Sequence, residues 1–196
     1  ISVYEERQAN PAWGQSMNPK FREMTLGEDL TPVSKLSGAF LSPKTPSHLS
    51  FAYYESSLVV EYIVKQFGLG ALKNILNDLG DGVEINAAIA KHTEPMDKLE
   101  PAFAAFAKTH AEELAPKLDW TKPKPEDLKA GVKAFTKKHP KNIYMLQRRA
   151  RKALTEKKWE DAKAPCRELI ELFPNQTGGD SAYLMLAKAH RELKEV

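Results

Sequence analysis

The segment 51–68, FAYYESSLVVEYIVKQFG, constrains the fold more than any other part of the chain. Its apolar side chains recur at spacings of three, four and seven residues, which places them on one broad face of an α-helix. These residues are Phe51, Leu58, Val59, Tyr62, Ile63 and Phe67. A second face carries Tyr53, Ser56, Ser57 and Val60. The pattern predicts a helix that is buried on two sides, at the centre of a helical assembly.

Glycines and capping residues set the expected ends of this helix. Gly68 and Gly70 are expected to end it. Two starting points fit the sequence: Thr45 as the N-cap with Pro46 at the first helical position, or Ser47 as the N-cap.

The rest of the chain is also helical in pattern. No segment alternates apolar and polar residues over the length of a strand, so the sequence predicts an all-α fold. The one cysteine, Cys166, excludes an internal disulfide. No apolar run approaches the ~20 residues that a membrane-spanning helix needs, so no membrane span is expected.

Charge and composition divide the chain into two parts. Residues 121–125, TKPKP, have the composition of a linker, so we expect a first part at 1–118 and a second at 119–196. Residues 117–158 hold 14 Lys and Arg but 4 Asp and Glu, whereas the whole chain has a net charge of +3. A solvated basic helical face is the favoured interpretation. Nucleic-acid binding is not expected, because aromatic residues do not alternate with the basic ones.

The second part contains a repeat. Pro140 and Pro174 lie 34 residues apart, which is the period of the tetratricopeptide repeat (TPR). Between them, small, apolar and helix-ending residues fall at the positions of that motif: Leu146, Ala150, Ala162, Leu169 and Pro174. Residues 119–196 therefore resemble a short TPR array, a series of helical hairpins with one complete repeat at about 142–174 and partial repeats on both sides.

TPR arrays bind proteins or peptides in a concave groove. The resemblance implies that Tyr144, Gln147, Arg148 and Arg151 lie toward or beside such a groove. Arg148 and Arg151 could then bind a carboxylate of the peptide. The alternative is that these four residues are solvated surface of an array too short to bind anything.

Four short segments of the first part are informative: 1–6 (ISVYEE), 30–36 (LTPVSKL), 52–56 (AYYES) and 99–103 (LEPAF). In this order they resemble segments of the helical C-terminal subdomain of a peptidase-MA-like, or gluzincin-type, zinc metallopeptidase. The family binds zinc through an HExxH motif and a later Glu. Here no two of His48, His92, His110, His139 and His190 are four residues apart, and the later Glu would precede Ile1. No metal site or cofactor is expected in this chain; zinc is expected only if a longer parent carries HExxH upstream.

These features lead to a functional hypothesis. The chain is interpreted as a non-catalytic part of a larger peptidase-MA-like TPR protein, possibly a zinc peptidase, that binds a protein or peptide through the TPR region. A bacterial parent exported to the periplasm is the expected source. Tyr53 would be a catalytic hydrogen-bond donor only within that parent, and is otherwise a core residue. The alternative is a free-standing helical adaptor without peptidase ancestry.

Overall fold

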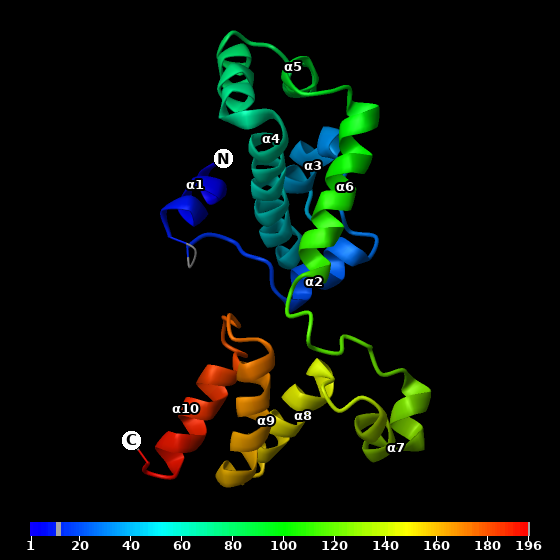
Figure 1. Ribbon diagram of the computed structural model, residues 1–196, viewed down its shortest axis with the longest axis vertical. Helices are drawn as coiled ribbons and strands as arrows, with labels where there is room; N and C mark the ends of the chain where they lie inside the picture. The colour runs from blue at the N-terminus through cyan, green and yellow to red at the C-terminus, as the bar shows by residue number, and fades with distance from the viewer. Residues whose placement is uncertain (11–12, 196) are drawn as a thin grey trace. The chain divides into compact units, whose positions relative to one another are not determined.

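The computed structural model describes residues 1–10 and 13–195, and all the regular secondary structure in these residues is helical (Figure 1). The predicted all-α class is thus confirmed. The chain forms two compact units, residues 1–114 and residues 115–196. The division falls a few residues before the predicted boundary at 118.

The first unit consists of α1 (Ser2–Ala9), α2 (Pro19–Leu26), the short 3-10 helix η1 (Val33–Lys35), α3 (Leu36–Leu41), α4 (Pro46–Gly80), α5 (Ile85–His92) and α6 (Met96–Glu112). The second unit consists of α7 (Pro125–Lys138), α8 (Ile143–Thr155), α9 (Trp159–Leu172) and α10 (Ala182–Glu192).

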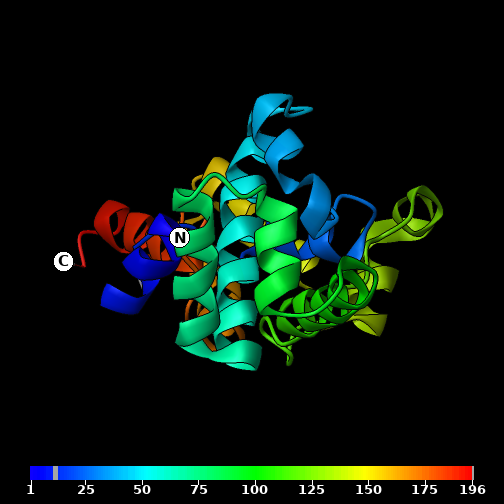
Figure 2. The same ribbon diagram turned by 90° about the horizontal axis from the view of Figure 1, so that it is seen from above.

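Helix α4 is the centre of the first unit. It contacts α1, α3, α5 and α6, and Figure 2 shows it with α5 alongside. The predicted apolar face is buried from Phe51 to Ile63, and Ser57 and Val60 of the predicted second face are buried too. Tyr53 is the exception, because 47% of its surface is exposed. Burial on two sides is therefore confirmed for most of the helix but not at Tyr53.

The ends of α4 follow partly from its sequence. Thr45 is the N-cap and Pro46 is the first helical residue, which decides between the two predicted starts. Gly68 breaks the helix with φ 83° and ψ 163°, a conformation that glycine adopts without steric cost. The chain turns helical again at once and continues to Gly80, because Leu72 and Ile75 pack into the core. The helix predicted from residue 51 therefore ends at Gly68 as expected, and α4 continues across this kink as a second helical segment.

Ion pairs and hydrogen bonds join α4 and α6 to their neighbours. Glu61 is 8% exposed, and its carboxylate lies 3.4 Å from Arg7 on α1, 2.7 Å from Lys65 and 3.8 Å from His110 on α6. In a second contact, the amide and hydroxyl of Ser34 both donate to Oε1 of Glu100, at 2.9 and 2.6 Å. These bonds lower the pKa of Glu100 and tie η1 to α6.

A second buried carboxyl group on α4 is less well satisfied. Glu55 is 1% exposed, and its Oε1 accepts a hydrogen bond from the backbone amide of Thr31. Its Oε2 is buried with no hydrogen-bond partner among the described residues. Burial disfavours the charged form and raises the pKa of Glu55 from 4.5 to about 7.

In the second unit, α9 packs against both α8 and α10. Alanines at the contacts have no exposed surface, namely Ala150 on α8, Ala162 on α9 and Ala189 on α10. Helices α8 and α9 lie within 142–174, where the sequence predicts one complete helical hairpin. Ser181 caps the start of α10, and its side chain accepts a hydrogen bond from the Leu184 amide.

The core of the first unit can be tested at Leu58, which is 1% exposed on α4. We expect Leu58→Ala to lower the free energy of unfolding by roughly 2–5 kcal/mol, because it leaves a cavity in a packed core. Urea unfolding followed by circular dichroism measures the change. The matched control is Leu41→Ala at a side chain that is 83% exposed, and an equal loss in both variants would contradict the observed core.

The raised pKa of Glu55 predicts how stability changes with pH. Between pH 4.5 and pH 7 the folded chain keeps this proton whereas the unfolded chain loses it, so stability falls as the pH rises through this window. The full effect is at most about 3 kcal/mol. Glu55→Gln should remove this slope and be more stable than the parent at pH 8.

Urea unfolding curves at several pH values measure both effects. Glu112→Gln, which removes an exposed carboxyl from α6, serves as the control and should leave the slope unchanged. The predicted pH dependence fails if the parent and Glu55→Gln lose stability in parallel.

Candidate functional site

The four predicted binding residues of the second unit lie together on one face of α8. Tyr144, Gln147, Arg148 and Arg151 are spaced three, four and seven residues apart, which puts them on one side of a helix. They line an open hollow of about 480 Å³, together with Met145, Lys152 and Thr155.

A second hollow of about 420 Å³ adjoins the first. It lies between α8 and α10 and shares Arg151 and Thr155 with the first hollow. Leu184, which is 56% exposed, and Met185 contribute apolar surface from α10. The two hollows together are called the α8–α10 groove below.

Packing on the opposite side of α8 forces this face outward. Leu146, Ala150 and Ala153 are buried. The start of the helix is fixed by Asn142, whose side chain accepts a hydrogen bond from the Met145 amide and donates one to the Thr121 carbonyl oxygen at 2.7 Å. The groove face of α8 is therefore held on a rigid element.

The charged side chains that line the α8–α10 groove are mostly cations. They are Arg148, Arg151, Lys152 and Lys188, with Asp180 as the carboxylate. Arg151 Nη2 lies 3.1 Å from Asp180 Oδ2, and both side chains are at least half exposed. Such exposed pairs contribute little energy, so an anionic ligand can replace Asp180 as the partner of Arg151.

Tyr53 and Cys166 lie in different surroundings from the groove residues. Tyr53 is half-exposed on α4, and its ring packs edge-on against Phe40 at 5.0 Å between centroids. The buried tyrosine of this segment is the neighbouring Tyr54. Cys166 is fully buried, and this burial raises the pKa of its thiol to about 11, so the reactive thiolate is scarce at neutral pH.

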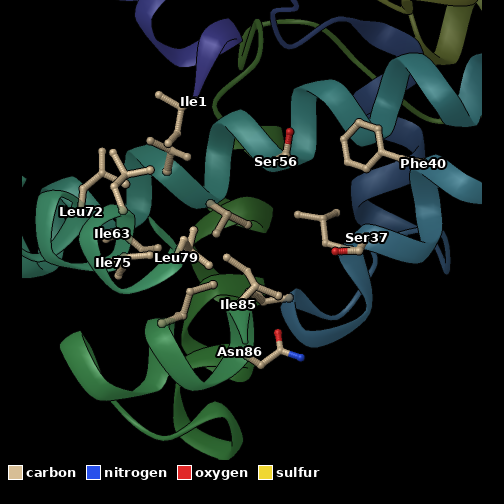
Figure 3. A pocket seen from close by; sticks show the side chains of 16 residues that line it. Ile1, Ser37, Phe40, Ser56, Ile63, Leu72, Ile75, Leu79, Ile85 and Asn86 are labelled. Carbon is tan, nitrogen blue, oxygen red and sulfur yellow. The ribbon is translucent and has the colours of Figure 1, made fainter. Parts of the chain in front are cut away.

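The first unit also contains an apolar pocket that the sequence did not predict. It has a volume of about 240 Å³ and lies among α3, α4 and α5 (Figure 3). In Figure 3 the side chains of Ile63, Leu72, Ile75 and Leu79 gather around it. Its wall within the described residues contains the polar side chains Ser37, Ser56 and Asn86 but no titratable one. The side chains around the pocket therefore offer a mainly apolar surface.

The described residues contain neither a cluster of metal ligands nor a helix that could span a membrane. Within residues 1–10 and 13–195, no group of three or more His, Cys, Asp or Glu side chains is placed to hold a metal ion. The expectation that zinc requires a longer parent stays a prediction. Throughout the described part of the chain, every helix is too short or too polar to cross a membrane.

In comparisons with known proteins, no family model, curated protein or solved structure matched the chain. The resemblances to TPR arrays and to peptidase-MA-like domains therefore stay predictions that rest on the residues quoted above.

The groove requires α8, α9 and α10 to pack closely together. A substitution at Ala162 tests this packing. Ala162→Leu adds volume where Ala153 and Ala189 already touch, so we expect it to lower the free energy of unfolding by roughly 1–3 kcal/mol. Ala164→Leu on the exposed side of α9 is the control and should change stability little. Thermal unfolding followed by circular dichroism compares them, and an unchanged midpoint for Ala162→Leu would refute this packing.

Proposed function

We propose that this chain binds an acidic segment of a protein or peptide through the α8–α10 groove. One observation carries the proposal: the four residues singled out from the sequence line one hollow, which joins a second hollow on α10 through Arg151 and Thr155.

The chemistry of the groove supports an acidic ligand. Arginine side chains bind carboxylates through two parallel N–H···O bonds, and Arg148 and Arg151 lie one turn apart on the same helix. Leu184 and Met185 lie beside these cations and would contact the apolar side chains of the ligand. Charged and apolar contacts in one groove favour an extended peptide over a bare anion.

We further propose that residues 115–196 are a short TPR array and that residues 1–114 derive from the helical subdomain of a peptidase-MA-like protein. The quoted sequence segments and the alanines at the helix contacts support these assignments. In this proposal the chain itself is non-catalytic and acts by binding. A helical adaptor without peptidase ancestry would use the same groove in the same way.

The binding proposal is tested by fluorescence anisotropy with a fluorescein-labelled penta-glutamate peptide at physiological salt. Arg148→Glu should weaken binding at least about tenfold, because it removes a charge-assisted hydrogen bond of roughly 1.5–3 kcal/mol and adds a repulsion. The matched control is Arg167→Glu, which makes the same charge change at an exposed position of α9. It should change the affinity less than about threefold.

Two outcomes would overturn the proposal. Equal losses in the two variants would mean that only the net charge attracts the peptide. Tighter binding of an oligothymidylate than of penta-glutamate, with equal sensitivity to both substitutions, would indicate a general polyanion surface.

A further inference from the structure

A second cavity, of about 250 Å³, lies in the first unit and has a polar wall. It is formed by the connection between α2 and η1, the connection between α3 and α4, and the first turns of α4. Its titratable lining residues are Glu28, Asp29, Lys44, His48 and Glu55. The cavity shares no residue with the α8–α10 groove.

Most of the charge at this cavity is already paired. Lys44 Nζ lies 3.1 Å from Asp29 Oδ1, and His48 Nε2 lies 3.3 Å from the same oxygen. The hydrogen bond from Lys44 is the largest cause of the lowered pKa of Asp29, and His48 adds to it. His48 Nδ1 in turn lies 2.8 Å from Thr45 Oγ1. Asp29 and Lys44 therefore neutralise each other.

Glu55 is the buried carboxyl group in the wall of the cavity, and its hydrogen bonding is incomplete. The Thr31 amide occupies its Oε1, whereas its buried Oε2 has no partner among the described residues. A buried carboxylate oxygen without a hydrogen bond is costly, and native proteins usually satisfy such an atom with a ligand or an ordered water. The cavity beside it has room for more than one water molecule.

We propose that this cavity binds a primary alkylammonium group, which donates a hydrogen bond to Oε2 of Glu55. Because Oε2 is buried, the carboxyl group turns toward the cavity when the ligand binds. An ammonium is a compact charge that can use a single acceptor, whereas a guanidinium prefers two oxygens, and Thr31 already occupies the other one. Leu30, Phe51 and Ala52 supply apolar wall against which the methylene groups pack. The ligand is either a free alkylamine or the lysine side chain of a protein.

Binding is coupled to ionisation of Glu55. Because burial raises the pKa of this carboxyl to about 7, part of the population is protonated at neutral pH and must release its proton to pair with the cation. The other charged groups at the cavity are Glu28, Asp29, Lys44 and His48, and the last three are held by the contacts described above. The ligand therefore lowers the pH at which Glu55 titrates.

The experiment is a pH titration of the full chain labelled with 13C at the glutamate carboxyl carbons, followed by NMR. The Glu55 signal is assigned by its loss in Glu55→Gln. The probes are n-butylammonium and the side chain of Nα-acetyl-lysine methylamide. A ligand at ten times its dissociation constant should lower the Glu55 midpoint by about one pH unit, if it binds only the ionised form.

Controls separate a hydrogen bond from general charge. Tetramethylammonium carries the same charge without an N–H donor and should leave the midpoint unchanged. Glu55→Gln should weaken n-butylammonium binding at least about tenfold, as judged by the amide shifts of Thr31 and Ala52. Glu28→Gln removes an equal charge from the cavity wall and should weaken it less than about threefold.

The two probes distinguish the sources of the ligand. A shift with both probes supports a protein lysine as well as a free amine, and a shift with n-butylammonium alone supports a free amine. The proposal is overturned if neither probe moves the midpoint, which would mean that water alone fills the cavity. An equal shift with tetramethylammonium would also overturn it.

Discussion

Burial of α4 on several sides is the constraint on which the first unit depends. Helices α1, α3, α5 and α6 all contact it, so that carboxyl groups on this helix cannot turn toward solvent. Glu61 and Glu55 lie six residues apart and meet this constraint in different ways. Glu61 gathers Arg7, Lys65 and His110 around it and thereby links three helices. Glu55 accepts a hydrogen bond from one backbone amide and keeps an oxygen without a partner among the described residues, burial raises its pKa, and it is the residue on which the proposed ammonium site rests.

The second unit is held together differently, by close packing of its helices. Its helices approach closely because alanines lie at the contacts, and Ala150, Ala162 and Ala189 leave no gap to fill with larger side chains. Packing of this kind uses only the inner face of α8. The outer face is free to carry arginines at helical spacing, and its rigidity comes from the capped start at Asn142. A face that carries cations beside exposed apolar side chains is suited to the recognition of an acidic peptide.

The two proposed sites are complementary in charge. The α8–α10 groove presents cations beside exposed apolar side chains and suits an acidic peptide. The cavity at Glu55 presents an unsatisfied carboxyl oxygen beside apolar wall and suits an ammonium group. Each site lies within one compact unit, so each can be tested in the full chain through substitutions that leave the other unit unchanged.

The sequence by itself determined the all-α class, the break in α4 at Gly68 and the placement of Tyr144, Gln147, Arg148 and Arg151 on one face of α8. These features depend on local periodicity and capping, which a sequence displays directly. Only the tertiary structure decided that Tyr53 is exposed, that Leu72 and Ile75 beyond Gly68 pack into the core, and that Glu55 is desolvated. The physical reason is that burial and pKa depend on neighbours distant in the sequence, and a helical pattern does not indicate which neighbour covers each face.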